Sequence, residues 1–304
     1  MARDVLKWEG AFTALATPFT VKGDVDWAAY ERLLERQLRG GISGVIPCGT
    51  TGESPTLTKE EKLKLIELAA KACKGKALVL AGTGSNNTMA SVELSKAACD
   101  HGADGLLIVV PYYNKPSQAG LEAHFTAIAD AVEKPVILYN VPGRTITSLT
   151  ATTVGHLARH PRIIGIKEAT GNMAVLTEMR EQVARLAPSR AFTWLSGDDP
   201  TLLPFLAVGG QGVISVASNI LPGAMVRLCK GGPTAFKEFE TLFAFFNALF
   251  VEANPVPCKT VLQWLGLCES AVRLPLVGLA PESEAKLRRA WEALPAEYRQ
   301  EARA

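Results

Sequence analysis

Lys167 is the residue whose position points most directly to chemistry. It follows the apolar run at 163–166 and therefore lies inside or at the end of a buried strand. Side chains alternate along a strand, so Lys167 shares a face with Gly165 and faces away from Glu168, which is a poor candidate to pair with it. Burial favours the neutral form of a lysine amine, and a neutral amine attacks ketones to form Schiff bases. The pattern allows two interpretations: a Schiff-base lysine, or a lysine that anchors a buried salt bridge.

Other polar residues also follow apolar runs. Tyr139 ends the run before that of Lys167, where its phenol would exchange protons with an intermediate on the lysine, or would be a packed aromatic with a wet hydroxyl. Thr50 and Thr51 lie between two glycines, in a turn whose hydroxyls and backbone amides can bind a carboxylate. Arg144 lies in a Pro-Gly-Arg-Thr loop, and its planar guanidinium suits a carboxylate. Taken singly, each feature has an ordinary explanation as well: the Thr50–Thr51 turn could be a simple capped turn, and Arg144 could be a solvated loop residue.

The strands that precede these residues must position them. Short runs rich in Val, Ile and Leu alternate with amphipathic segments, and eight runs are strand candidates, at 10–19, 44–53, 77–86, 105–114, 135–145, 162–171, 192–199 and 212–219. Runs that are apolar on both faces are typical of parallel strands covered by helices. Eight such units predict an α/β fold of the (β/α)8 TIM-barrel type, because an open doubly wound sheet usually has fewer strands and no Gly-x-Gly-x-x-Gly follows the first strand. Barrel active sites lie at the carboxyl ends of the strands, where these polar residues fall.

Helix ends can also be predicted. Thr58 and Glu61 have the spacing of a capping box, at the start of a helix within 58–76. Gly40 and Gly75 fall where a helix C-cap uses a residue that is free to adopt positive φ.

The chain is predicted to form one domain. Residues 1–232 would form the barrel that carries the active site, and residues 233–304 a C-terminal helical extension packed on it. Aromatic residues recur in the extension at steps of three and four, at Phe236, Phe239, Phe243, Phe246 and Phe250. This stripe predicts packing against the barrel or against a partner subunit.

Composition excludes several classes of protein. The 304 residues carry a formal net charge of +2, so no basic stripe for nucleic acid is expected. The most apolar tract, 241–251, is too short to cross a membrane. The first residues lack the apolar core of a secretory signal, and the six cysteines include no Cys-x-x-Cys pair. We therefore expect reduced thiols in a cytoplasmic protein.

Two pairs of residues have the types found at metal sites. His156 and His160 are one helical turn apart, but no third ligand lies nearby, which indicates two surface histidines. Asp198 and Asp199 are placed where a helix N-terminus would favour negative charge. Neither pair predicts a metal.

Taken together, the strand-end motifs resemble a known family. GTTGES (49–54), PYYNKPSQ (111–118), YNVPGRT (139–145), IKEATG (166–171), SGDD (196–199) and GGQGVISVASN (209–219) are similar to the dihydrodipicolinate synthases, which belong to the pyruvate-dependent class I aldolases and lyases. The similarity runs in register from about residue 10 to at least 280 and includes ANPVPCK (253–259) and RLPL (273–276).

The resemblance implies a role for each matching residue. Lys167 would form the Schiff base with pyruvate, and Tyr139 would be the general acid–base, linked to Thr50 and Tyr113 in a proton relay. Thr51 and the backbone at Ile214 would hold the pyruvate carboxylate, with Gly197 lining the site. Arg144 would bind the carboxylate of the second substrate. No metal or organic cofactor is implied.

The family's assembly and reaction are implied as well. The tyrosine at the position of Tyr113 reaches in from a neighbouring subunit, so a dimer would be the smallest complete unit, and two dimers would pair into a homotetramer. The implied reaction condenses pyruvate with L-aspartate 4-semialdehyde to 4-hydroxy-tetrahydrodipicolinate, for lysine and diaminopimelate biosynthesis. Two alternatives stay open: a lyase for a 2-keto-3-deoxy sugar acid or N-acetylneuraminate, and a non-catalytic carboxylate sensor.

One departure from the family concerns regulation. Ser54, Asn86 and Tyr112 match its lysine-effector site. Members inhibited by lysine tend to have histidine at the positions of Lys59 and Lys62 and glutamate at that of Ala90. Two cations and a methyl group therefore replace residues suited to a cationic amino acid, and we expect weak or absent inhibition by lysine.

Overall fold

A closed barrel of eight parallel strands forms the centre of the molecule. The computed structural model describes residues 7–303. The strands are β1 (Gly10–Ala14), β2 (Gly44–Ile46), β3 (Leu78–Gly82), β4 (Gly105–Val109), β5 (Val136–Asn140), β6 (Ile163–Glu168), β7 (Thr193–Ser196) and β8 (Gly212–Ser215). They pair in chain order, and β8 closes the ring on β1. The predicted TIM barrel is confirmed, and each strand begins within one residue of its predicted run.

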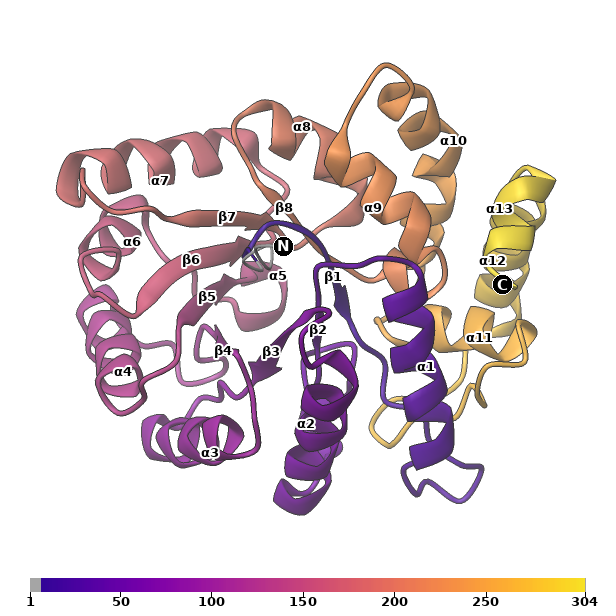
Figure 1. Cartoon of the computed structure of the whole chain (residues 1–304), viewed down its shortest axis with the longest axis horizontal. Helices are drawn as coiled ribbons and strands as arrows, with labels where there is room; N and C mark the ends of the chain where they lie inside the picture. Colours follow the sequence, from indigo (N-terminus) through magenta and orange to yellow (C-terminus); the bar gives the residue numbers. More distant parts are fainter. Residues whose placement is uncertain (1–6, 304) are drawn as a thin grey trace.

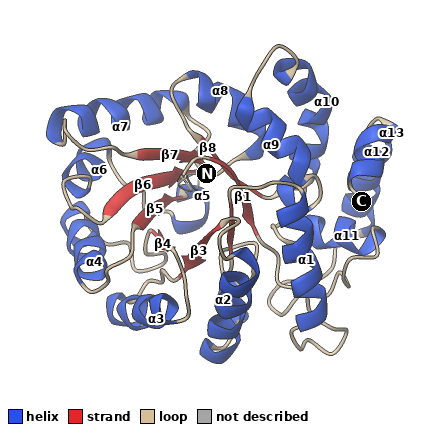
Figure 2. Cartoon of the chain, in the orientation of Figure 1, coloured by secondary structure: helices blue, strands red, loops and turns tan. Residues whose placement is uncertain are grey.

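Helices surround the barrel (Figures 1 and 2). They are α1 (Trp27–Arg39), α2 (Lys59–Cys73), α3 (Thr88–Asp100), α4 (Gln118–Asp130), α5 (Pro142–Thr145), α6 (Ala151–Leu157), α7 (Met173–Leu186), α8 (Leu202–Ala207) and α9 (Pro222–Lys230), with 3-10 turns η1 (Ser54–Thr56), η2 (Asp199–Thr201) and η3 (Ala217–Asn219). The helices cover the outer face of every strand, which explains why the strands are apolar on both faces.

The helix caps agree with the sequence except for one backbone angle, the φ of Gly40. Thr58 and Glu61 form a complete capping box at the start of α2, and Gly75 has φ +72°. Gly40 is the C-cap of α1, as predicted, but its φ is −69°, and the left-handed residue is Gly41, at +75°. Gly40 is needed for another reason: a Cβ there would lie 2.5 Å from the Cβ of Pro222 at the start of α9.

Two apolar layers fill the molecule. The larger lies between the strands and the helices, and a second fills the barrel itself. The inner layer includes Phe12, Ile46, Leu80, Leu107, Ile137, Tyr139, Leu195 and Ile214. Lys167 stands in register with Tyr139 on one side and Leu195 on the other, so its side chain belongs to this inner face. The barrel is thus a packed core whose upper end carries the polar groups.

The C-terminal extension consists of α10 (Ala235–Ala248), α11 (Val256–Trp264), α12 (Pro281–Glu292) and α13 (Ala296–Glu301). Its helices lie along the side of the barrel formed by α1 and α9 (Figure 1). Residue 232, the predicted boundary, falls between α9 and α10, and the division stays a prediction. The aromatic stripe is split: Phe239 and Phe246 are buried, as is Phe245, whereas Phe236, Phe243 and Phe250 are 66%, 45% and 39% exposed.

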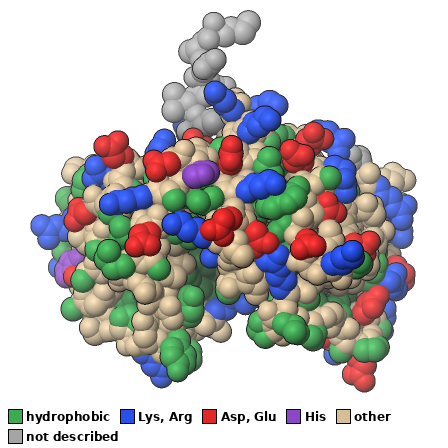
Figure 3. All heavy atoms as spheres, turned by 90° about the horizontal axis from the view of Figure 1, so that it is seen from below, with side chains coloured by type: hydrophobic (Ala, Val, Ile, Leu, Met, Phe, Trp, Pro, Cys, Tyr) green, Lys and Arg blue, Asp and Glu red, His purple; other side chains and the backbone are tan. Residues whose placement is uncertain are grey.

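Charges of both signs are interspersed over the face shown in Figure 3. No helix among residues 7–303 is both long and apolar enough to span a bilayer. All six cysteines are free, and burial raises the pKa of every one of their thiols, to about 12 for Cys48 and Cys73. The thiols are therefore protonated at neutral pH.

Candidate active site

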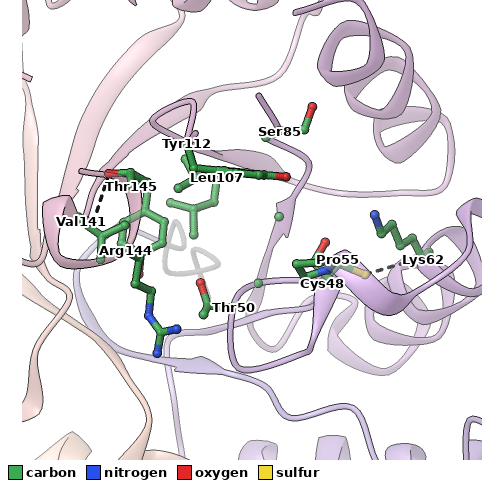
Figure 4. A pocket seen from close by; sticks show the side chains of 16 residues that line it. Cys48, Thr50, Pro55, Lys62, Ser85, Leu107, Tyr112, Val141, Arg144 and Thr145 are labelled. Atoms are coloured by element: carbon green, nitrogen blue, oxygen red, sulfur yellow. Dashed lines mark hydrogen bonds between the residues drawn. The ribbon is translucent and has the colours of Figure 1, made fainter. Parts of the chain in front are cut away.

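A cavity of about 260 Å³ opens at the carboxyl ends of strands β2 to β5. Its walls contain hydroxyls from Thr50, Ser54, Ser85, Tyr112 and Tyr139 and two cations, Lys62 and Arg144. Figure 4 shows the hydroxyl of Thr50 pointing toward the centre of this pocket. Six of the residues named from sequence line it together: Thr50, Ser54, Lys62, Tyr112, Tyr139 and Arg144.

Lys167 lies beside this cavity, against Tyr139. Its Nζ is 4.1 Å from the centroid of the Tyr139 ring, and its residue is only 6% exposed. None of the ion pairs among residues 7–303 involves Lys167. A buried amine with an aromatic neighbour and no counter-ion has the environment expected of a nucleophile.

Glu168 faces the other way, as the alternation of side chains predicts. Its carboxylate accepts hydrogen bonds from the Asn140 amide at 3.1 Å and from the Thr170 hydroxyl at 2.7 Å. Burial raises the pKa of this carboxyl, and the hydrogen bonds oppose the shift. Glu168 thus joins the ends of β5 and β6 from the outside of the barrel.

Gly197 follows β7 and makes room for the lysine. A Cβ on Gly197 would lie 3.0 Å from Lys167 Cε and 2.6 Å from the Cβ of Ala169. Any other residue at 197 would push the lysine chain out of its place. Ile214, in β8, is buried in the barrel interior.

Thr51 and Arg144 meet at a residue that the sequence did not single out. The Asn254 side-chain amide donates to Thr51 Oγ1 at 2.9 Å, and Arg144 donates to the Asn254 carbonyl at 3.4 Å. Asn254 is 6% exposed, whereas Arg144 is solvent-exposed. Its chain segment, ANPVPCK, was part of the family resemblance, but no local pattern assigned it a role.

A second missed group lies behind the same turn. Lys259, in α11, forms a fully buried ion pair with Glu53 at 2.7 Å. Lys259 interrupts the apolar helix α11 just as Lys167 interrupts an apolar strand, so the signal was present in the sequence.

The residues predicted for the proton relay and for the effector site differ in whether they reach this chain's cavity. Tyr113 is 90% exposed and has φ +73°, so its phenol points away from this chain's own cavity. The Asn86 carbonyl accepts from Asn114 at 2.8 Å. Of the three departures, Lys62 lines the cavity, and burial lowers its pKa, whereas Lys59 and Ala90 are exposed on α2 and α3.

The two pairs of residues whose types occur at metal sites, His156 with His160 and Asp198 with Asp199, interact with other groups of the protein. His156 and His160 contact separate carboxylates, Glu122 at 2.9 Å and Asp130 at 3.0 Å. Asp198 precedes η2 and accepts from Thr201, as expected at a helix N-terminus. Asp199 is buried and accepts from the backbone amides of Val216 and Ala217 at 3.0 and 2.8 Å.

Comparison with known proteins agrees with this geometry. The model of the dihydrodipicolinate synthetase family matches residues 7–294. The chain belongs to this family. Among its relatives, the 4-hydroxy-tetrahydrodipicolinate synthase of Bdellovibrio bacteriovorus is 48% identical over 286 residues, covering 92% of this chain and 96% of the relative. That of Leptospira biflexa is 47% identical over 279 residues, covering 90% and 92%.

Solved structures of the dihydrodipicolinate synthetase family have the same fold. The dihydrodipicolinate synthase of Aquifex aeolicus superposes with a TM-score of 0.89 at 42% identity, covering 94% of this chain and 97% of that one. The 4-hydroxy-tetrahydrodipicolinate synthase of Methylacidiphilum fumariolicum gives a TM-score of 0.91 at 41% identity, covering 97% of both chains.

Proposed function

We propose that this member of the family is a lyase that condenses pyruvate with L-aspartate 4-semialdehyde to form 4-hydroxy-tetrahydrodipicolinate. The observation that carries the proposal is the buried amine of Lys167, which has no counter-ion among residues 7–303. It lies 4.1 Å from the centroid of the Tyr139 ring, beside a cavity rich in hydroxyls. Two relatives that are 47% and 48% identical to this chain are 4-hydroxy-tetrahydrodipicolinate synthases, which supports the same reaction.

The chemistry follows from a neutral amine at Lys167. Its nitrogen adds to the ketone carbon of pyruvate, and the carbinolamine loses water as an iminium ion. Loss of a proton from the methyl carbon gives an enamine, which forms the new carbon–carbon bond with the aldehyde. Because the product is cyclic, the amine of the second substrate then adds to the iminium carbon and releases Lys167.

Each proton transfer needs a group close to the lysine. Tyr139 is in register with Lys167 on the next strand, so its phenol gives a proton to the departing hydroxyl and takes one back during release. Thr50 lines the same cavity, and its hydroxyl would connect the Tyr139 phenol to Tyr113 in the proton relay.

Two positively polarised regions would hold the two carboxylates. We assign the pyruvate carboxylate to Thr51 and the backbone at Ile214, and the space beside the Lys167 chain to the absence of a side chain at Gly197. The guanidinium of Arg144 is exposed at the cavity and donates to the Asn254 carbonyl at 3.4 Å, a long hydrogen bond that leaves its other N–H groups to bind the carboxylate of aspartate semialdehyde.

The relay would be completed by a second copy of the chain. Tyr113 is 90% exposed on its own subunit, and we propose that it enters the cavity of a neighbour, in a dimer that pairs into a tetramer. Six free thiols suit the reducing cytoplasm, where we place the reaction.

We further propose that L-lysine inhibits this protein weakly or not at all. The ammonium of Lys62 lines the cavity next to Ser54 and would repel a cationic effector. Activity measured against lysine concentration checks this, and sharp inhibition below millimolar lysine would contradict it.

Borohydride reduction in the presence of pyruvate tests the nucleophile. Peptide mass mapping should find a three-carbon addition at Lys167 and none at Lys259, the other buried lysine. Incubation of the enzyme with pyruvate and either aspartate semialdehyde or a sugar-derived aldehyde then identifies the second substrate. Turnover of only the sugar aldehyde would replace the proposed reaction by that of a sugar-acid lyase, and an unmodified Lys167 would remove the enzymatic proposal altogether.

A further inference from the structure

A buried ion pair ties the C-terminal extension to the turn that carries Thr50 and Thr51. Lys259 Nζ lies 2.7 Å from Glu53 Oε1, and the side chains are 0% and 1% exposed. The other carboxylate oxygen of Glu53 accepts the backbone N–H of Arg273 at 3.0 Å. Lys259 also lies over the ring of Phe19, 4.2 Å from its centroid. Both oxygens of one carboxylate are therefore fixed by residues more than 200 positions away.

The backbone of this turn is in a conformation that needs support. Glu53 has φ +53°, in the left-handed region, which costs a residue with a side chain about 1–2 kcal/mol. Its N–H donates to the Thr50 carbonyl at 3.0 Å, so the conformation of Glu53 sets that of the two threonines before it. Such conformations persist where surrounding contacts hold them.

Two more contacts from the extension bind the same turn. The Asn254 amide donates to Thr51 Oγ1 at 2.9 Å, and Arg273 donates to the Thr56 carbonyl at 2.9 Å. The turn is held in this way at Thr51, Glu53 and Thr56, on both sides of its bend. Asn254, Lys259 and Arg273 belong to the C-terminal extension. The barrel adds one further contact, from the Thr17 hydroxyl after β1 to the Gly52 carbonyl at 2.8 Å.

We propose that the Glu53–Lys259 pair is a positioning device for Thr50 and Thr51, which makes the C-terminal extension part of the pyruvate-binding site. This inference rests on the function proposed above. Stability alone is a weak reason for such a pair, since well-packed apolar residues often replace a buried ion pair without loss. An apolar pair cannot fix an orientation in this way, whereas the carboxylate fixes the Glu53 backbone and, through the turn, the Thr50 hydroxyl that faces the cavity and the buried hydroxyl of Thr51.

Three variants of the full-length protein test the inference: Glu53→Gln, Lys259→Met and the double variant. Gln keeps the size of Glu53 and an acceptor for Lys259, and Met keeps the volume of Lys259 without its charge. We expect the KM for pyruvate to rise at least about tenfold in all three, with a smaller change in kcat at saturating pyruvate. The double variant, which has no unpaired buried charge, should regain most of the wild-type Tm while its KM stays high.

A matched control separates positioning from general weakening of the extension. Glu301→Gln removes a carboxylate that accepts from the Ala224 N–H at 2.8 Å and from Arg227 at 2.8 Å, on the side of the extension away from the turn. It should lower Tm and leave the KM for pyruvate unchanged.

The outcomes distinguish this inference from the proposed function. If wild-type protein gives no pyruvate adduct, the function fails first. If wild type forms the adduct and the folded Glu53 and Lys259 variants keep a KM within twofold of wild type, the positioning inference is overturned. Failure of all three variants to fold overturns it equally, because the pair would then serve the fold and not the site.

Discussion

Two lysines in this molecule share a similar environment and differ in one contact. Lys167 and Lys259 are both buried, both interrupt apolar segments, and both lie over an aromatic ring, at 4.1 Å from Tyr139 and 4.2 Å from Phe19. Lys259 has the Glu53 carboxylate at 2.7 Å, and the ion pairs of residues 7–303 give Lys167 no carboxylate at all.

The difference assigns the two lysines to different tasks. Burial lowers the pKa of Lys259, and the charge of Glu53 opposes that shift, which keeps the cation in place as a structural contact. Lys167 has no carboxylate of this kind among residues 7–303, so no ion pair ties up its nitrogen beside the cavity. Burial alone does not mark a reactive lysine; burial beside a cavity and without an acid does.

Replacing each lysine by the isosteric methionine tests this comparison most directly. Lys167→Met should abolish adduct formation and lower kcat by about a thousandfold or more, without loss of stability, since it removes an uncompensated polar group. Lys259→Met should keep adduct formation at saturating pyruvate and lose about 3–5 kcal/mol of stability, because it strands a buried carboxylate. Borohydride trapping and urea unfolding measure the two effects, and an exchange of the two outcomes would refute the assignment.

Asp199 extends the comparison to a buried acid. Burial raises its pKa from 3.8 to about 6, so the folded state binds this proton more tightly than the unfolded state does. Its contribution to stability is therefore full below pH 4, falls as pH rises to 6, and is constant above that. The Asp199→Asn variant has no carboxyl to titrate at this position, so its stability lacks this pH-dependent contribution.

The stability of wild type relative to Asp199→Asn should accordingly fall by on the order of 3 kcal/mol between pH 4 and pH 6. Urea unfolding of both proteins at each pH gives the difference directly. A difference that stays flat or grows over this range would show that the buried carboxylate is better compensated than its contacts indicate.

Gly197→Ala sharpens the comparison by moving Lys167 without removing it. The added methyl would lie 3.0 Å from Lys167 Cε, so the lysine chain must shift. The same methyl would lie 2.6 Å from the Cβ of Ala169, which must also move. Because a misplacement of about 1 Å costs roughly a hundredfold in rate, the smaller shift expected here should cost roughly tenfold. Single-turnover adduct formation measures it, and a rate equal to wild type would mean that the lysine is not held by this contact.

Arg144 is a third cation near the site, and it is exposed, not buried. Arg144→Ala should raise the KM for aspartate semialdehyde roughly 10- to 100-fold, the value of a hydrogen-bonded charge, and leave pyruvate adduct formation unchanged. Steady-state kinetics with each substrate varied in turn separates the two effects. Equal losses for both substrates would place the pyruvate carboxylate at Arg144 instead.

Sequence reasoning was reliable where local pattern determines structure. All eight strands and the inward face of Lys167 follow from apolar runs and alternation, which are properties of neighbouring residues. Gly40 is the predicted C-cap, but the left-handed φ belongs to Gly41, and glycine is needed at 40 for a tertiary reason, because Pro222 excludes a side chain there.

The contacts that hold the site could not be predicted in the same way. Asn254 contacts Thr51 across 203 positions of the chain, and Lys259 contacts Glu53 across 206. No local pattern in either segment predicts which residue it will contact. The aromatic stripe is a related case, because its spacing does not show which of its residues the barrel will cover, and the part of the prediction that concerns a partner subunit stays a prediction.

Because the six native thiols are protonated at neutral pH, an introduced cysteine can be used to probe the surface around Tyr113. With every native sulfhydryl protonated at neutral pH, alkylating reagents should act slowly on the folded chain. A cysteine introduced by Tyr113→Cys would then be the one fast target, and its rate of modification upon dilution would report how often that position is shielded by a neighbouring molecule.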